Sequence, residues 1–125
     1  MSRVGLFLYG TLKRGQRRHD LLASGEFLGP AVTIPRYRLY ALARYPILVE
    51  SPENGDAIHG ELWVVPPETL DALDAYEEVP TLYVRQSIAL QSPHPMDLPI
   101  EAYLFAQPIP ANAIRCVEWP IVGSA

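Results

Sequence analysis

Proline sets the strongest limit on how this chain can fold. There are thirteen prolines in 125 residues, about twice the usual share of roughly 5%. Because proline lacks a backbone N–H and has a fixed φ, it disfavours helix interiors and central strands. The composition therefore favours short strands joined by shaped turns. With 49% apolar and 19% charged residues, the chain is typical of a globular protein, and we expect a single domain over residues 1–125.

The use of cysteine and the lengths of the apolar runs bear on the compartment. A single cysteine, Cys116, excludes an intrachain disulfide framework and fits a reducing compartment. The apolar run at residues 4–8 is too short for a signal-peptide core, and no run approaches the roughly 20 residues of a membrane span. We therefore expect a soluble, cytoplasmic protein with no membrane partner.

Hydrophobic periodicity predicts a mixed α/β (α+β) fold. Strands are expected at residues 4–9, 27–33, 36–42, 46–49, 57–65, 82–90 and 100–105. A short helix is expected at 16–23 and a clearer one at 67–78, with Pro67 in its first turn and Pro80 beyond its end. Residues after Gln107 have no clear pattern. Many short strands with one or two short helices indicate a small curved sheet or β-barrel.

The segment at residues 7–19 reads FLYGTLKRGQRRH and contains Gly10 and Gly15. Glycines after a strand, with positive charge nearby, indicate backbone that lies close to an anion. Its four basic residues are interpreted as a solvated helix face: Lys13, Arg14, Arg17 and Arg18. Since no aromatic residue is interleaved among them, we expect no nucleic-acid partner. A basic-loop nucleic-acid binder remains an alternative, which salt-dependent retention on DNA or RNA would test.

One carboxylate of the predicted helix at 67–78 stands apart from the others. At about 100° per residue, Glu77 falls between Leu70 and Leu73 on the apolar face, whereas Asp71, Asp74 and Glu78 are expected to face solvent. A core-facing carboxylate loses hydration, which raises its pKa above about 4.3 and suits it to general acid/base work. The alternative is a frayed helix end from which Glu77 turns out to water.

Other catalytic patterns are absent from the sequence. The spacing of Gly10 and Gly15 resembles a phosphate loop but lacks the following Lys and Ser/Thr. His19, His59 and His94 have no second ligand at metal-site spacing, so no metal is predicted. No nucleophile elbow is present, and Cys116 has no histidine partner at a known spacing, so it is interpreted as a small core residue.

Two segments taken together resemble the γ-glutamylcyclotransferase-like superfamily, which includes AIG2-like proteins and γ-glutamylamine cyclotransferase. They are LFLYGTLKRGQRRH at 6–19 and LDAYEEVPTLYVR at 73–85, with further matches in YPILV at 45–49, IHGELWVV at 58–65 and EAYLF at 101–105. The resemblance covers about residues 4–106, and the tail at 107–125 stays unassigned. It implies a compact mixed α/β barrel with one pocket.

The resemblance also implies roles for particular residues. Loop residues Tyr9, Gly10, Thr11 and Leu12 would present backbone N–H groups to the substrate, and Glu77 would be the catalytic residue. Gly10 would let the backbone approach the ligand. Tyr83 and Tyr103 match positions where an aromatic hydroxyl lines the pocket, and they fit half-buried strand tyrosines equally well. Arg85 is a candidate partner for the acidic helix. No cofactor and no metal are implied.

The implied reaction is an intramolecular cyclisation. The α-amine of a γ-glutamyl group attacks its own γ-carbonyl, which gives 5-oxoproline and releases an amine or amino acid, with Glu77 as general acid/base. The loop YGTLKRG is closer to the γ-glutamylamine and AIG2-like branch than to the glutathione-pathway enzymes, whose loop ends in Ser-Asn. The alternatives are a noncatalytic small-ligand-binding or interaction domain of the same fold, and an enzyme acting on another acyl-amine. The sequence names neither the leaving amine nor the oligomeric state.

Overall fold

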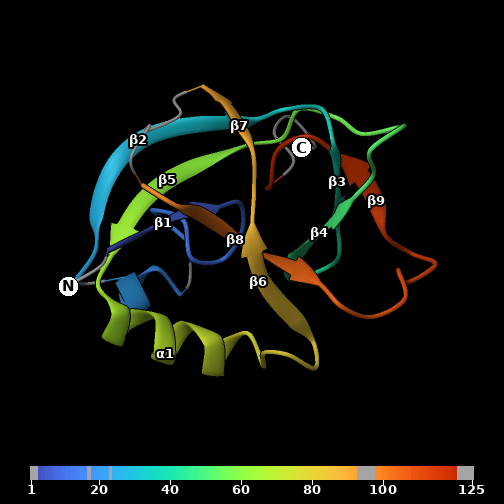
Figure 1. Ribbon diagram of the computed structural model, residues 1–125. Helices are drawn as coiled ribbons and strands as arrows, with labels where there is room; N and C mark the ends of the chain where they lie inside the picture. Colours follow the sequence, from blue (N-terminus) through green and yellow to red (C-terminus); the bar gives the residue numbers. More distant parts are fainter. Residues whose placement is uncertain (1–2, 17, 23, 93–97, 121–125) are drawn as a thin grey trace.

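The computed structural model describes residues 3–16, 18–22, 24–92 and 98–120 (Figure 1). Its elements are β1 (Val4–Leu8), the short 3-10 helix η1 (His19–Leu22), β2 (Glu26–Thr33), β3 (Tyr37–Ala41), β4 (Pro46–Glu50), β5 (His59–Val65), α1 (Pro67–Tyr76), β6 (Tyr83–Ser87), β7 (Leu90–Ser92), β8 (Ile100–Phe105) and β9 (Ile114–Cys116). Six strands form one sheet in the order β6-β8-β1-β5-β2-β7, and β4-β3-β9 form a second. Within the described residues, no helix has the length and apolar character of a membrane span.

The larger sheet curves because one segment of chain supplies both of its edges. β6 lies at one edge and β7 at the other, yet only Ile88 and Ala89 separate them in sequence. Two linking residues span at most about 10 Å, so the two edges must come close together. The sheet is therefore a curved half-barrel, with β7 continuing upward from β6 (Figure 1). This confirms the expected mixed α+β class with a small curved sheet.

The prediction of one continuous strand at 82–90 is wrong, because this segment forms both edges of the sheet and is divided into β6 and β7. The chain pairs with β8 as far as Ser87 and then with β2 from Leu90, and Ala89 between them donates its N–H to the Tyr37 hydroxyl at 3.0 Å. Apolar periodicity records which side chains are buried, but not which neighbouring strand accepts the backbone hydrogen bonds.

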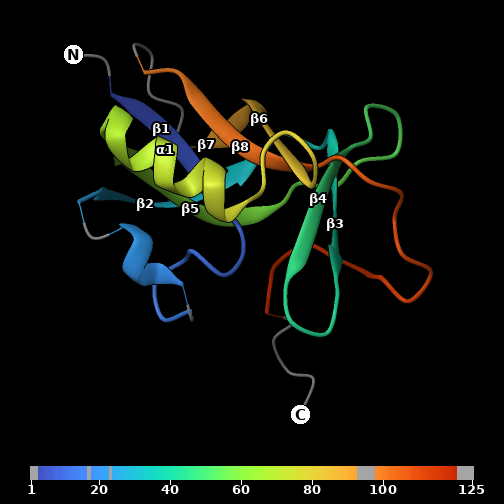
Figure 2. The same ribbon diagram turned by 90° about the horizontal axis from the view of Figure 1, so that it is seen from below.

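The central strand β1 is buried on both faces. Leu6 and Leu8 belong to the cluster that packs under α1, whereas Phe7 and Tyr9 belong to the cluster on the other side of the sheet. A strand covered on both faces needs apolar residues at successive positions, which explains the continuous run at the start of the sequence. Figure 2 shows α1 lying across this strand, with β3 and β4 crossing its direction farther along the molecule.

The helix predicted at 16–23 is largely replaced by turns, with only η1 at His19–Leu22. Gly15 has a positive φ of 79°, so the chain reverses there before a helix can begin. Conversely, the unpatterned tail contains β9, which pairs with β3 through Leu39 and Cys116. β9 has only three residues and its Ile114 is 60% exposed, too short and too irregular a pattern to detect in sequence.

Proline positions fit the limits set out from the sequence. Pro46 begins β4 and Pro67 begins α1, where no ladder or helix bond is lost. Pro30 lies inside β2 opposite Glu61 of β5, but β7 pairs with β2 only at Val32 and Thr33. The missing N–H of Pro30 therefore removes no bond to β7.

Gly60 of β5 provides a test of this packing. A Cβ atom there would lie 2.5 Å from the carbonyl oxygen of Leu8 and 2.7 Å from the Phe7 ring. We expect Gly60→Ala to lower the free energy of unfolding by about 1–3 kcal/mol in urea denaturation, because backbone of the central strand must move. The control is Gly5→Ala, whose nearest contact is the rotatable end of Ile100 at 2.6 Å. Equal losses in both variants would contradict this account.

Candidate active site

Sheet topology brings several predicted site residues to one end of the half-barrel. β1 and β8 run parallel, so their carboxyl ends lie at the same end of the sheet. β6 is antiparallel to β8 and begins at that end, with Tyr83 opposite Phe105. α1 ends just before β6 begins, which carries Glu77 there as well.

A cavity of about 330 Å³ opens at this end. Its lining comprises Phe7, Leu8, Tyr9, Gly10, Thr11, Leu12, Tyr45, Pro46, Tyr76, Glu77, Glu78, Leu82, Tyr83 and Tyr103. All seven residues predicted from the sequence are therefore brought together. The substrate contacts and the catalytic role assigned to them remain predictions.

Sequence reasoning missed part of the wall, notably Tyr45, Pro46 and Tyr76. Tyr76 lies three positions after Leu73, so the helical periodicity that selected Glu77 could also have selected Tyr76. Tyr45 and Pro46 come from the turn before β4 and its first residue. Local pattern could not find them, because β4 belongs to the second sheet and reaches the cavity only through tertiary packing.

Glu77 is fixed by the way α1 ends. Its N–H bonds to the Leu73 carbonyl at 2.9 Å, and Glu78 follows with a left-handed φ of 53°. The N–H of Glu78 bonds to Ala75 at 3.2 Å and that of Val79 to Asp74 at 3.0 Å, which is the Schellman arrangement, with glutamate in the place usually taken by glycine. The chain therefore turns away from the helix axis directly after Glu77.

The carboxyl group of Glu77 lies in a poorly hydrated place. Burial raises the pKa of Glu77 from its usual value of 4.5 to about 7, and no cation among the described residues offsets this. Desolvation disfavours the charged form of a carboxyl group, which is the effect that the helical periodicity predicted. A group with this pKa exchanges protons readily near neutral pH.

The loop after β1 places backbone donors in the same cavity lining as this carboxyl group. Gly10, Thr11 and Leu12 are buried in the cavity wall. Their carbonyls are partly engaged, since Gly10 accepts from Lys13 and Thr11 accepts from Arg18, each at 3.0 Å. Within the described part of the chain, the N–H groups of Gly10, Thr11 and Leu12 donate to no backbone carbonyl. Donors of this kind at a cavity wall are suited to bind an anion.

The structure gives a further reason for glycine at position 10, and the close approach to a ligand stays a prediction. A Cβ atom at Gly10 would lie 2.8 Å from Cγ of Pro46. Glycine therefore lets the loop pack against the start of β4.

The tyrosine hydroxyls of the wall are engaged with the protein itself. Tyr83 donates to the Pro46 carbonyl at 3.2 Å, Tyr103 donates to Asp74 at 2.7 Å, and Tyr9 donates to the Tyr103 carbonyl. Burial raises the pKa of each of these three phenols well above its usual value. All three stay protonated at neutral pH and hold the wall together.

The basic residues of the loop do not form the solvated helix face that was predicted. Lys13 is buried and donates from Nζ to the Trp119 carbonyl, and burial lowers the pKa of Lys13. Arg14 lies 3.8 Å from the centre of the Phe27 ring, and Arg18 pairs with Asp20 at 3.5 Å. The prediction fails because this segment folds back on itself instead of forming a helix. Arg17 lies outside the described residues.

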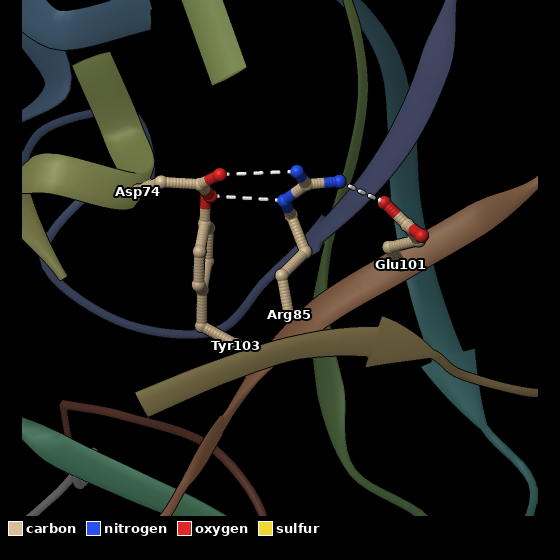
Figure 3. A network of polar contacts seen from close by, with 4 residues as sticks. All are labelled: Asp74, Arg85, Glu101 and Tyr103. Carbon is tan, nitrogen blue, oxygen red and sulfur yellow. Dashed lines mark hydrogen bonds and ion pairs between the residues drawn. The ribbon is translucent and has the colours of Figure 1, made fainter. Parts of the chain in front are cut away.

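Asp74 was expected to face solvent, and this is wrong. Its carboxylate accepts two bonds from Arg85, at 2.9 and 3.0 Å, and a third from Tyr103 (Figure 3). The suggestion that Arg85 is a partner of the acidic helix is confirmed. Periodicity assigned Asp74 to the solvent side because sequence does not show that β6 places a guanidinium beside that face.

Neither of the two histidines that the structure describes lines the cavity. His59 is exposed on β5, and the ring of His19 approaches the Leu12 carbonyl at 3.0 Å. His94 lies outside the described residues. No group of three metal-ligating side chains occurs in the ranges that the structure describes.

A curved sheet with a cavity walled by loop amides and a partly buried glutamate defines a recognisable class of protein. A sequence model described as "Gamma-glutamyl cyclotransferase, AIG2-like" matches residues 6–120, and the chain belongs to this family. The match extends past residue 106 into the tail that sequence analysis left unassigned.

Individual relatives agree with this assignment. The chain is 42% identical over 83 residues to a Vibrio cholerae protein named "Putative gamma-glutamylcyclotransferase", covering 66% of this chain and 70% of that protein. It is 36% identical over 95 residues to gamma-glutamylaminecyclotransferase A of Danio rerio, covering 70% of this chain but 59% of that longer protein. The crystal structure of a mouse AIG2-like protein superposes with a TM-score of 0.77 at 29% identity, covering 88% of this chain and 82% of that one.

The raised pKa of Glu77 predicts a pH-dependent effect on stability. The pKa of Glu77 is about 7 in the native state and about 4.5 in the unfolded state. Between pH 4.5 and 7 the carboxyl group therefore ionises more fully in the unfolded state, so the contribution of Glu77 to stability falls as pH rises through this range. We expect Glu77→Gln, which carries no charge, to raise the free energy of unfolding by up to about 3 kcal/mol at pH 8.5 and to change it little at pH 4. Urea denaturation at both pH values measures the difference. A pH-independent effect would mean that Glu77 is well hydrated.

Proposed function

We propose that this protein is a γ-glutamylcyclotransferase that converts a γ-glutamyl amide to 5-oxoproline and a free amine. The observation that carries the proposal is the position of Glu77, a partly buried, poorly hydrated carboxyl group with a pKa of about 7 in the same cavity wall as the loop amides. Family membership and the names of the relatives support the same reaction. The amine-specific name of the zebrafish relative makes γ-glutamyl amines the first substrates to test.

The two charged groups on the α-carbon of a glutamyl substrate suit the two features of the wall. Its α-carboxylate would accept hydrogen bonds from the N–H groups of Gly10, Thr11 and Leu12. Its α-ammonium would lie against Glu77, where an opposite charge favours the ionised carboxylate. No basic side chain lines the cavity in the described residues, so the backbone carries the anion binding. Binding both groups fixes the α-carbon in the cavity, and the amine reaches its own γ-carbonyl when the glutamyl side chain folds back.

The reaction then needs one group to move a proton. Glu77 takes a proton from the α-ammonium, and the freed nitrogen attacks the γ-carbonyl carbon to close a five-membered ring. The ring nitrogen then carries one proton too many, and this proton passes to the leaving nitrogen. The bond between the carbonyl carbon and that nitrogen breaks as Glu77 returns its own proton, so the amine departs as an ammonium ion. The products are 5-oxoproline and the amine, and no water is consumed. A carboxyl group with a pKa near the working pH supplies about 10²–10⁴ in rate at such a step.

Glu77 is the carboxyl group of the wall whose raised pKa suits it to this role. The phenols of Tyr9, Tyr83 and Tyr103 have raised pKa values, and each donates a hydrogen bond to an acceptor of the protein itself. Glu78 lines the cavity but is exposed, and it is the residue with left-handed φ at which the chain turns away from the helix. A noncatalytic small-ligand-binding domain of the same fold remains the alternative. A buried carboxyl group with a raised pKa lowers stability at neutral pH, and simple binding gives no reason to retain it.

The reaction is tested by incubating the protein with γ-glutamyl amines, γ-glutamyl-ε-lysine, γ-glutamyl amino acids and glutathione. We expect 5-oxoproline, quantified by mass spectrometry, from at least one member of the panel, and a loss of at least 10²-fold in Glu77→Gln. Circular dichroism confirms that the variant is folded. If folded Glu77→Gln forms 5-oxoproline at the wild-type rate, Glu77 is not the acid/base. Binding of a γ-glutamyl compound without turnover would favour the noncatalytic alternative.

The rate should also depend on pH in a defined direction. Because the free enzyme must hold Glu77 as a carboxylate to accept the proton, kcat/KM should rise with pH through a midpoint near 7. The residual activity of Glu77→Gln should lack this rising limb. A midpoint near 4.5 in the wild-type protein would contradict the assigned environment of Glu77.

A further inference from the structure

A cluster of charged residues lies directly behind the cavity wall. Arg85 of β6 donates from Nε and Nη2 to the two carboxylate oxygens of Asp74 on α1, and from Nη1 to Glu101 of β8 (Figure 3). Tyr103 of β8 donates to the same Asp74. The side chains of Asp74, Arg85 and Glu101 are each only about a quarter exposed, so solvent weakens these contacts less than at an open surface. We refer to these four residues as the Arg85 network.

The register of the strands explains why these residues meet. Arg85 is paired with Tyr103 across the β6–β8 ladder. Arg85 lies two positions after Tyr83 on β6, and Glu101 lies two positions before Tyr103 on β8. Because side chains two positions apart share a face of a strand, these four strand residues all project from the face that α1 covers. α1 therefore meets a guanidinium and a phenol on the sheet, and its Asp74 carboxylate accepts hydrogen bonds from both.

Asp74 also holds the end of the helix through its backbone. Its carbonyl accepts the Val79 N–H at 3.0 Å in the bond that closes the turn after Glu77. Asp74 thus joins the sheet through its side chain and the helix terminus through its main chain. Glu77 lies three residues, less than one helical turn, beyond Asp74.

We propose that Arg85 is a positioning residue for Glu77, holding the last turn of α1 against β6 and β8 so that the Glu77 carboxyl group stays in the cavity. The proposal rests on the function proposed above only for its kinetic readout. It assigns Arg85 no contact with substrate, since Arg85 is not among the residues that line the cavity. Tyr103 belongs both to the cavity wall and to the Arg85 network, because it lines the cavity and donates to Asp74.

An ion pair elsewhere in the fold gives a matched control. Arg115 of β9 bonds Asp56 through Nε at 2.9 Å and Nη2 at 3.0 Å, the same two-pronged geometry as Arg85 with Asp74. Neither Arg115 nor Asp56 lines the cavity. A double variant that neutralises both members leaves the net charge unchanged at either pair, so the control removes an ion pair of the same two-pronged geometry away from the cavity.

The first experiment follows the titration of Glu77 itself by the ¹³C shift of its side-chain carboxyl group. The ionisable groups that share its surroundings are Tyr9, Tyr45, Tyr76, Glu78, Tyr83 and Tyr103, with Asp74 and Arg85 behind them. We expect a midpoint near 7 in the wild-type protein and a shift of at least one unit toward 4.5 in Asp74→Asn/Arg85→Met, because a released helix end lets water reach the carboxylate. Asp56→Asn/Arg115→Met should keep the wild-type midpoint.

The second experiment measures turnover of the best γ-glutamyl substrate. Asp74→Asn/Arg85→Met should lose roughly 10²-fold in kcat with little change in KM, because Glu77 is misplaced while the loop amides are intact. Arg85→Lys keeps the positive charge but cannot bond both oxygens of Asp74, so it should remain folded with an intermediate loss in kcat. The Asp56 and Arg115 control should retain wild-type kcat.

The outcomes separate this proposal from the function on which its kinetics depend. If the wild-type protein forms no 5-oxoproline, the proposed function fails, and the titration of Glu77 still decides the role of Arg85. An unshifted Glu77 midpoint in folded Asp74→Asn/Arg85→Met would overturn the proposal. Full kcat in folded Asp74→Asn/Arg85→Met would also overturn it.

Discussion

Burial of β1 on both faces is the constraint on which the rest of the structure depends. A strand with Leu6 and Leu8 on one side and Phe7 and Tyr9 on the other must lie in the middle of the fold, with a layer packed over each face. α1 supplies one layer and the second sheet supplies the other. Because β1 is central, the loop that follows it leaves the sheet between those layers, which is where the cavity forms.

The electrostatics of the cavity follow from the same arrangement. The wall contains backbone donors and neutral phenols but no basic side chain among the described residues, so Glu77 is desolvated without a compensating cation. Just behind the wall the opposite holds. There Asp74 is paired with Arg85, and although burial would raise the pKa of Asp74, hydrogen bonds from Arg85 and Tyr103 and the charge of Arg85 lower it. Two carboxylates three residues apart on one helix thus acquire opposite shifts, which is the usual way in which proteins assign different roles to similar groups.

Much of the site could be predicted because its features are local. The helical period placed Glu77 on the apolar stripe with Leu70 and Leu73, and the structure puts both leucines in the core and Glu77 at the cavity. The glycine loop was identified from its position after an apolar strand. Three predictions were wrong because a partner from another part of the fold decides each feature. Lys13 and Asp74 were expected to face solvent, but Lys13 donates to Trp119 and Asp74 pairs with Arg85. The strand expected at 82–90 is interrupted at residues 88–89, where the chain passes from β8 to β2. Composition and periodicity carry no information on such partners.

By itself, therefore, the sequence determined the short strands and their mixed class, the single clear helix, the loop after the first strand and the carboxylate at the helix end. These features depend on residue type and on spacing within one or two turns of chain. Only the tertiary structure decided that β6 and β7 form the two edges of one curved sheet, that Tyr45 and Pro46 complete the cavity, and that Arg85 lies behind the cavity wall. The physical reason is that hydrogen-bond pairing between strands and the loss of water from a carboxyl group are set by which distant segments pack together, and that is a property of the whole fold.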